Sequence, residues 1–410
     1  MSERYPGGLI RKTPPTVTGP TDGEGGSAPG IWTLEEVAYY EKEGGWPKPT
    51  LPRELYMWGT NGFGMLGDNS VVAASSPVQV GADTNWSKIV GSKYSTYAIK
   101  QTNSLWSWGY DEKGALGQNT NLVHRSSPVQ IGSLTNWDIV EGGNEFAYAI
   151  KTDGTLWSWG NNLYGTLGQG DSIYRSSPTQ VGSDTWATVS SGNTSFALMI
   201  KTDGTLWAVG NNSAQYAFGN GTTTDSNILV QTGTDTDWSS VAAGLYGGLA
   251  IKTDGTLWAW GYNGYGVGGN STSTAADIPT PVQVGALTTW SKVSYDSRTV
   301  YAIRTDGTLW AWGYGSFGLC AQNTRISYSS PVQIGSGTWK EARGQGNFAA
   351  AITSSGELYS WGDNGAGGLG QNTPITLDRS SPVQIGSASD WLSLAGGSEG
   401  GNFIGALKTG

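Results

Sequence analysis

A tryptophan–glycine pair recurs along this chain at nearly constant spacing, and this repeat constrains the fold more than any other feature. The pair begins at Trp58, Trp108, Trp159, Trp260, Trp312 and Trp361, and a seventh copy has Val209 before its glycine. Neighbouring copies lie about 50 residues apart, which is a period typical of repeat architectures. Equivalent units of this kind are expected to stack in a row or to close into a ring.

Each unit contains four short segments in a fixed order. The unit that includes Asp153 and Gly154 reads SSPVQIG, NWDIVEGG, FAYAIKTDGT and LWSWG. The Asp-Gly pair predicts a hairpin, because its turn requires positive φ. FAYAI and LWSW are bulky at successive positions, which is typical of strands covered on both faces. Four strands in each of seven units predict an all-β fold, a seven-bladed β-propeller of four-stranded blades.

The two ends of residues 53–410 carry complementary parts of one repeat. The chain ends on WLSLAGGSEGGNFIGALKTG, which stops where the hairpin turn would follow, and the first repeat begins with the missing strand, ELYMWG. An open solenoid would instead need capping units at its ends. We therefore expect the N- and C-terminal strands to pair in one blade and to close the ring.

The order W-x-x-V…A-I-K-T-D-G-T-L-W-x-W-G-x-N-x-x-G-x-L-G resembles the RCC1 (regulator of chromosome condensation) repeat over residues 54–410. This resemblance implies the propeller fold and says little about activity. The founding member is a guanine-nucleotide exchange factor for a small GTPase, but the even spacing here leaves no room for the insertions that such factors use. Family members often carry histidine between the two middle strands, where this chain has Asn144 and Asn193.

Residues 1–52 do not share the repeat. Residues 5–30 are rich in Pro, Gly and Thr and are expected to be an extended arm. Thr33 and Glu36 form a capping-box pattern for a short helix, which is too short to be stable alone and must dock on something. The candidate anchor side chains are Ile10, Trp32, Leu34, Val37, Tyr40 and Trp46.

The same segment, GGLIRKTPPTVTGP followed by APGIWTLEEVAYYEKEGGWP, is similar to leaders on virion proteins of tailed phages, especially marine cyanophages. This resemblance implies that residues 1–52 attach the chain to other virion proteins. The resulting hypothesis is a non-enzymatic structural or adhesion protein of a phage particle, as a single chain or a homo-oligomer. The alternative is a cytosolic RCC1-like protein-interaction module of the exchange-factor or inhibitor type.

Composition excludes several functions and locations. The net charge is −9, so the chain lacks the basic balance expected of a nucleic-acid-binding protein. The N-terminus has no apolar segment of a secretory signal, and no apolar run is long enough to span a membrane. We expect no nucleic-acid partner and no membrane insertion. The expected location is the virion, after synthesis in the host cytoplasm.

Several residues could suggest chemistry, and we interpret them as structural. The tryptophans occupy repeated positions, which favours core burial over sugar platforms. Gly160 and its equivalents lack the lysine of a phosphate loop, which favours turns. A TDGT turn supplies one carboxylate, whereas a calcium loop needs several oxygen ligands. Asp235 and Asp237 together form only a weak calcium candidate.

The chain has one histidine, His124, and one cysteine, Cys320. A lone histidine makes neither a catalytic triad nor a metal cluster, and no histidine near Cys320 is evident to activate the thiol. The sequence therefore predicts no catalytic residue, no metal site and no cofactor, and the protein is not expected to be an enzyme.

The repeats differ most between the Leu-Gly and Ser-Ser-Pro elements, in loops that strand alternation places on one rim. Loops on a rigid scaffold often carry function, although these could also be simple solvated loops. This rim is expected to bind a host-surface glycan or a protein. The candidate binding residues are His124, Arg125, Tyr174, Arg175, Arg325, Tyr328 and Arg379.

Overall fold

The computed structural model describes residues 4–5, 8–9, 51–193, 195–213, 215–271, 276–296, 298–373, 377–395 and 402–410. The chain divides into two compact units, Met1–Pro52 and Arg53–Gly410. In the first unit β1 (Arg4–Tyr5) pairs with β2 (Gly8–Leu9) in antiparallel orientation. The expected helix lies outside the described residues, as do the anchor candidates Ile10, Trp32, Leu34, Val37, Tyr40 and Trp46.

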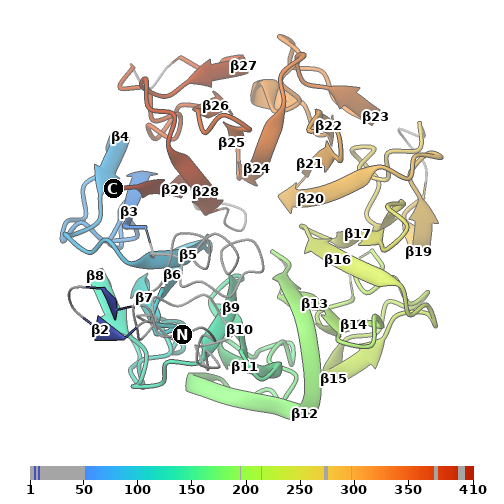
Figure 1. Cartoon of the computed structure of the whole chain (residues 1–410). Coiled ribbons are helices and arrows are strands. Elements are labelled where there is room, and N and C mark those ends of the chain that lie inside the picture. The colour runs from blue at the N-terminus through green and yellow to red at the C-terminus, as the bar shows by residue number, and fades with distance from the viewer. Residues whose placement is uncertain are drawn as a thin grey trace. The chain divides into compact units, whose positions relative to one another are not determined.

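The second unit is a ring of antiparallel blades, as Figure 1 shows. Four blades are continuous in sequence. They consist of β5 (Trp86–Gly91), β6 (Ser95–Lys100), β7 (Leu105–Gly109) and β8 (Arg125–Gln130); β16 (Trp238–Ala243), β17 (Gly247–Lys252), β18 (Leu257–Gly261) and β19 (Ile278–Gln283); β20 (Trp290–Asp296), β21 (Thr299–Arg304), β22 (Leu309–Gly313) and β23 (Tyr328–Gln333); and β24 (Trp339–Gln345), β25 (Phe348–Thr353), β26 (Leu358–Gly362) and β27 (Arg379–Gln384). A short 3₁₀ helix, Ser316–Gly318, follows β22.

Two further blades share one long strand. Their sheet comprises β9 (Trp137–Gly142), β10 (Phe146–Lys151), β11 (Thr155–Gly160), β12 (Arg175–Ser191), β13 (Phe196–Lys201), β14 (Leu206–Gly210) and β15 (Ser226–Gln231). The 17 residues of β12 pair with β11 in their first part and with β13 in their second part. β12 is therefore the outer strand of one blade and the inner strand of the next.

The seventh blade closes the ring. Its order is β28 (Trp391–Ala395), β29 (Phe403–Thr409), β3 (Arg53–Gly59) and β4 (Ala74–Gln79). The register of β29 with β3 runs without interruption from Phe403 opposite Gly59 to Thr409 opposite Arg53. The predicted seven blades and the predicted pairing of the two terminal strands are confirmed within the described part of residues 53–410.

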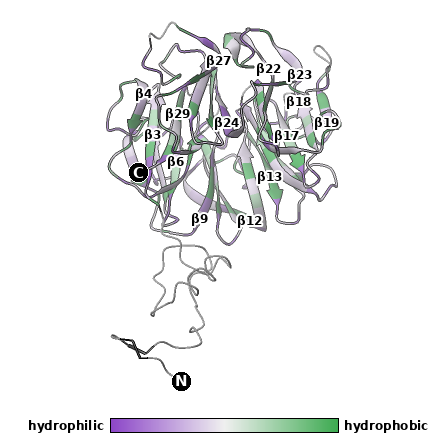
Figure 2. Cartoon of the chain, turned by 45° about the horizontal axis from the view of Figure 1, so that its top comes forward, coloured by the Kyte–Doolittle hydropathy of each residue, from purple (hydrophilic) through white to green (hydrophobic). Residues whose placement is uncertain are grey.

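Structural blades are out of phase with the repeat read from the sequence. The tryptophan-led segment is the innermost strand of each blade, and SSPVQ is the outer strand of the blade that precedes it. Six outer strands carry a proline, which cannot donate a main-chain hydrogen bond and so discourages edge-to-edge pairing. These prolines are Pro77, Pro128, Pro178, Pro281, Pro331 and Pro382. Hydrophobic segments lie mainly on the strands in Figure 2.

The Asp-Gly hairpins form as predicted, and only the glycine takes positive φ. Gly154 has φ 83°, and its N–H donates to the carbonyl oxygen of Lys151 at 2.8 Å. Oδ1 of Asp153 accepts from the amide and hydroxyl of Thr155 at 3.0 and 2.7 Å. The Thr155 hydroxyl accepts from Nε1 of Trp157 at 3.0 Å. The hydroxyl and amide of Thr155 also hold the pKa of Asp153 below its usual value.

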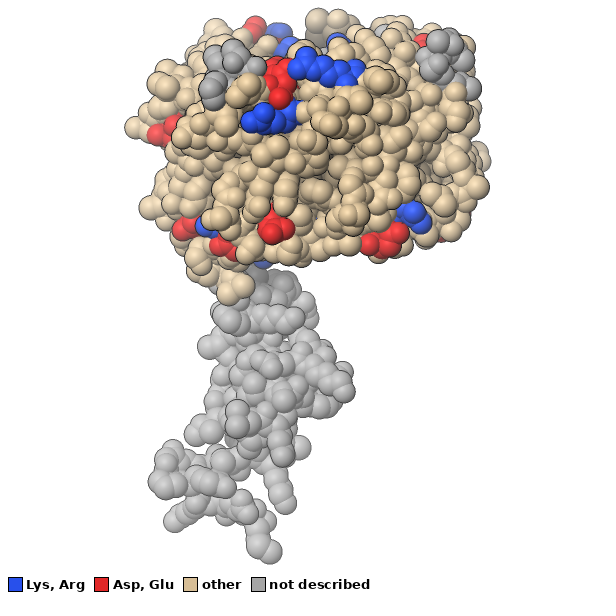
Figure 3. Space-filling model, turned by 90° about the horizontal axis from the view of Figure 1, so that it is seen from above, with Lys and Arg blue, Asp and Glu red and all other residues tan. Residues whose placement is uncertain are grey.

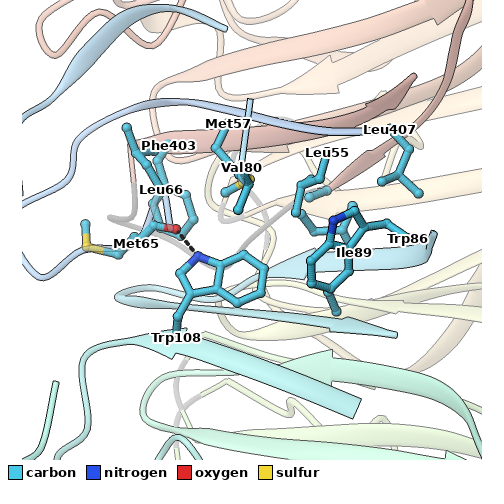
Figure 4. Packing of buried hydrophobic residues seen from close by; sticks show 12 residues of the cluster. Leu55, Met57, Met65, Leu66, Val80, Trp86, Ile89, Trp108, Phe403 and Leu407 are labelled. Atoms are coloured by element: carbon cyan, nitrogen blue, oxygen red, sulfur yellow. Dashed lines mark hydrogen bonds between the residues drawn. The ribbon is translucent and has the colours of Figure 1, made fainter. Parts of the chain in front are cut away.

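The tryptophan of the Trp-Gly pair joins its blade to the preceding blade in six of the seven junctions. Nε1 of Trp108 donates to the main-chain oxygen of Met65 at 2.8 Å, inside a cluster of buried side chains from both blades (Figure 4). The bond recurs at 2.8–3.0 Å in six junctions, from Trp58, Trp108, Trp159, Trp260, Trp312 and Trp361 to Gly368, Met65, Ala115, Ala217, Val267 and Leu319.

Glycine is needed where a loop meets this tryptophan. Gly117 has φ 69°, and a Cβ placed there would lie 2.8 Å from Nε1 of Trp159. Gly132 has a similar φ of 61°, but a Cβ there would meet nothing within 4 Å. The two glycines therefore separate the cost of backbone conformation from the cost of close approach.

We expect Gly117→Ala to destabilise the propeller more than Gly132→Ala. In both variants, alanine in the left-handed backbone region lowers the free energy of unfolding by about 1–2 kcal/mol. Gly117→Ala adds an overpacking cost of roughly 1–3 kcal/mol at the blade junction. Chemical denaturation of both variants measures the difference, and equal losses of stability would contradict the proposed role of close approach.

Removal of residues 402–410 is expected to lower the melting temperature strongly, because it deletes β29 from the middle of the closing blade. Phe403 and Leu407 of this strand are buried against Leu55 and Met57 of β3 (Figure 4). Deletion of exposed Gly410 alone is the matched control and should leave the melting temperature nearly unchanged. A small change in melting temperature on the longer deletion would show that the ring does not depend on the pairing of β29 with β3.

Candidate functional site

Strand register assigns each loop to one of two faces of the ring. Gly160 pairs with Phe146 on one side and with Arg175 on the other. Turns between first and second strands and loops between third and fourth strands therefore share one face, which we call the loop face. The hairpin face is opposite and carries the TDGT turns and the connections between consecutive blades. This arrangement agrees with the alternation expected from the sequence.

The hairpin face contains a repeated contact between lysine, tryptophan and aspartate. Nζ of Lys252 lies 4.9 and 4.8 Å from the ring centroids of Trp238 and Trp258. The same Nζ lies 2.7 Å from Oδ2 of Asp235 and 3.1 Å from Oδ1 of Asp237. Both aspartates of the weak calcium candidate are thus engaged by a lysine. Within the described ranges no group of three or more His, Cys, Asp or Glu side chains could hold a metal.

The tryptophans that begin the inner strands also have structural partners. Each packs edge-to-face against an aromatic ring of the third strand, as Trp137 does on Trp157 at a centroid distance of 5.9 Å. The indole N–H groups of these inner-strand residues have no hydrogen-bond acceptor among the described residues. Edge-to-face geometry places the positive edge of one ring on the negative face of the other. These buried rings are therefore not available as sugar platforms.

Cys320 is buried, and burial raises the pKa of its thiol to about 12. A thiol with so high a pKa is not an activated nucleophile. Nδ1 of His124 accepts a hydrogen bond from the amide of Asp111 at 3.0 Å, and its ring stacks on Tyr110 at 4.8 Å. The geometry gives both residues local structural contacts.

Four of the candidate rim residues occupy one equivalent position on the loop face. Each is the first residue of an outer strand and pairs with the glycine that ends the third strand: Arg125, Arg175, Tyr328 and Arg379. His124, Tyr174 and Arg325 lie in the loops that lead into these strands. The structure brings all seven residues to one face but distributes them over four blades, so they do not form one pocket.

Two of the rim arginines are held by carboxylates. A guanidinium nitrogen of Arg175 lies 2.7 Å from Oδ2 of Asp171, and one of Arg325 lies 3.1 Å from Oδ2 of Asp378. Nε of Arg125 donates to Oε1 of Gln118 at 3.2 Å. On the side of the ring in Figure 3, charged side chains gather near its two edges, and the wall between them is mostly uncharged.

Sequence reasoning missed a set of exposed aliphatic side chains on the loop face. Val72, Leu122, Ile173 and Ile326 are 71%, 65%, 63% and 61% exposed. Each follows the Trp-Gly pair of its repeat by the same number of residues. Alignment of the variable loops on that pair would have shown the shared apolar position. Leu122 also has φ 62°, an unfavourable conformation for this side chain.

The centre of the ring holds a second feature that the sequence did not reveal. A cavity of about 200 Å³ lies between the inner strands. The charged side chains in its lining are Glu141 of β9, Asp296 of β20 and Arg343 of β24. Burial raises the pKa of Glu141 to about 7, and the Arg343 charge opposes this shift.

Aromatic side chains cluster at two places on the loop face. One cluster joins Phe63, Tyr94, Tyr110 and His124 with centroid distances of 4.6–5.7 Å. The other joins Tyr246, Tyr262, Tyr265 and Tyr314, with the Arg298 guanidinium 5.7 Å from the last two rings. In the described part of the chain, no helix is both long and apolar enough to cross a membrane.

Comparison with known proteins agrees with this fold. The ultraviolet-B receptor UVR8 of Arabidopsis thaliana is 25% identical over 287 residues, which cover 68% of this chain and 64% of the receptor. The mitochondrial RCC1 domain-containing protein RUG3 of the same plant is 24% identical over 293 residues, which cover 68% of this chain and 54% of that protein. The chain thus spans less than two thirds of the length of either relative.

Solved structures give the same result for the fold. Prp20p from Saccharomyces cerevisiae has a TM-score of 0.77 at 17% identity, covering 88% of this chain and 92% of that chain. Human WBSCR16 has a TM-score of 0.76 at 18% identity, covering 87% and 99%.

The family described as RCC1-like domain matches residues 54–403. Residues 1–53 lie outside this match, so their resemblance to phage leaders stays a prediction. The family match and the closed ring of four-stranded blades together show that this chain belongs to the RCC1-like domain family.

Proposed function

We propose that this chain is a non-catalytic protein-interaction module that binds its partner through the loop face. The observation that carries the proposal is the repeated exposure of Val72, Leu122, Ile173 and Ile326 at one equivalent position. Burial of exposed aliphatic groups in an interface is favourable, because it removes apolar surface from water. The hairpin face, by contrast, consists largely of near-identical turns whose polar groups bond to one another.

The composition of the loop face supports a protein partner. Tyrosine, phenylalanine and arginine are enriched in protein interfaces, and all three occur in its aromatic clusters. The structure of Prp20p, which shares this fold, is described together with its binding to Gsp1p and histones. We extend to this chain only the use of such a propeller as a binding surface.

The loop-face proposal predicts the behaviour of a fourfold variant, Val72→Ser, Leu122→Ser, Ile173→Ser and Ile326→Ser. These exposed positions should tolerate serine in the free protein, so the melting temperature should change little. Partner binding should fall at least tenfold, because the apolar contacts are lost. Quantitative cross-linking and affinity purification of the full chain from its native source provide the measurement.

Leu134→Ser combined with Leu287→Ser is the matched control for this experiment. Both leucines are exposed, at 46% and 42%, and lie in connections on the hairpin face. The control should retain the partners of the unaltered chain. Equal loss of partners from both variants, or retention by the fourfold variant, would overturn the assignment of the loop face.

We further propose that residues 1–52 attach this module to a virus particle, where the loop face contacts host-surface or neighbouring virion components. The support is the resemblance of this leader to those of tailed-phage virion proteins. The competing function is a cytosolic interaction module of the exchange-factor or inhibitor type, to which the family match gives more support.

Deletion of residues 1–50 separates these two functions. If the leader is an attachment device, the remaining propeller should stay folded but should no longer enter particles. Particle fractions from complemented infections, probed for the full chain and for the deletion, provide the measurement. Normal incorporation of the shortened chain would rule out attachment through the leader.

A further inference from the structure

Two side chains of opposite charge, Glu141 and Arg343, lie at the same depth in the central channel. Glu141 and Arg343 each occupy the fifth position of the tryptophan-led inner strand of their blade, counted from the tryptophan. The equivalent residues of the other five blades are uncharged: Val90, Ser190, Ala242, Ser294 and Ala395. The repeat therefore places one carboxyl and one guanidinium at the same depth in a ring of mostly small side chains.

These two charges face each other across the ring. The blade of β9 and the blade of β24 are separated by the closing blade and the β5–β8 blade on one side, and by three blades on the other. Strands β9 and β24 lie on different sides of the centre in Figure 1. The two groups nevertheless interact electrostatically: Arg343 opposes the rise in the pKa of Glu141, and Glu141 helps to raise the pKa of Arg343.

Arg343 is oriented by its own strand. Its Nε donates to Oε1 of Glu341 at 3.2 Å, and Oε2 of the same carboxylate accepts from the amide of Leu394 at 3.1 Å. The Arg343 side chain remains 41% exposed despite its position in the channel. Glu341 thus fixes one edge of the guanidinium and leaves the rest of it open to the cavity.

The cavity between the two charges is polar and has groups that lack partners. It measures about 200 Å³ and is lined by residues of six inner strands, including Ser191, and by Asn193 in the turn after β12. Oγ of Ser191 and Nδ2 of Asn193 are buried without a hydrogen-bond partner among the described residues. Buried polar groups are normally satisfied by protein, water or ligand. The small residues of the ring leave space for such a ligand.

We propose that this cavity binds a small zwitterion of the amino-acid type. The carboxylate of the ligand pairs with the open edge of the Arg343 guanidinium, a geometry that favours two parallel hydrogen bonds. The ammonium of the ligand lies toward Glu141, and its presence compensates the buried carboxylate. This site is distinct from the loop face, so the ligand proposal can be tested independently of the proposed protein partner.

The pH dependence of binding follows from Glu141. Its carboxyl loses a proton as the pH rises through about 7, so attraction for an ammonium group increases over that range. The other titratable or charged groups around it are Arg343 and Glu341 of β24 and Asp296 and Tyr295 of β20. Arg343 stays charged throughout, because the neighbouring carboxylates outweigh the burial that lowers its pKa and leave the pKa raised.

Isothermal titration calorimetry of the full chain tests the proposal with glycine, β-alanine and γ-aminobutyrate, whose charges are separated by increasing lengths. At least one of the three should bind at a single site, more tightly at pH 8 than at pH 6. Acetate and methylammonium each satisfy only one of the two charges and should bind at least tenfold more weakly.

Glu141→Gln and Arg343→Gln should each weaken binding of the preferred zwitterion at least tenfold. Glu141→Gln should also remove the difference between pH 6 and pH 8. Arg53→Gln, which changes the arginine that begins β3, is the matched control and should bind as the unaltered chain does. Circular dichroism verifies folding, and Glu141→Gln alone decides the matter if Arg343→Gln fails to fold. Absence of binding by all three zwitterions at millimolar concentration, or unchanged binding by Glu141→Gln, would overturn the proposal.

Discussion

The hydrogen bond from a tryptophan of one blade to a loop oxygen of the preceding blade is the contact on which the ring depends. A blade has bulky side chains on both faces and cannot bury them alone, so it needs a neighbour on each side. The indole fills the space between two blades, and its N–H fixes their relative position, as Trp108 does on Met65. Gly117 and the equivalent glycines let the loop approach the indole closely enough for this bond.

One junction lacks the bond, because Val209 stands where the other repeats have tryptophan. At this same junction β12 continues without a break from one blade into the next. The loop oxygen of Thr166, equivalent to the acceptors elsewhere, still accepts from the hydroxyl of Tyr148. Two strand ladders on one continuous strand thus join the blades where the indole is missing. The ring therefore keeps its regular geometry although one of its seven junctions lacks the indole hydrogen bond.

The repeat predicted the blades, the hairpins and the closing pair of strands, because periodicity and turn chemistry act over short distances in sequence. It did not predict which loop side chains would be exposed together, since Val72 and Ile326 become equivalent only after the loops are aligned. It could not relate Glu141 to Arg343 either, because only closure of the ring brings β9 and β24 around one channel. Candidates chosen by residue type, such as Arg175 and Arg325, are engaged by nearby aspartates, a contact that the sequence alone did not predict. Their role in binding stays a prediction.

A symmetric scaffold makes deviations from symmetry informative. Positions that repeat in every blade, such as the tryptophans and the Asp-Gly turns, are accounted for by packing and turn formation. A charge at one inner-strand position is different, because the same backbone accommodates serine or alanine in neighbouring blades. Burial of a carboxyl in such a channel is unfavourable for its ionised form, as the raised pKa of Glu141 shows. Packing therefore does not require a carboxyl at this position, and the place of Glu141 opposite Arg343 fits the proposed ligand that carries both complementary charges.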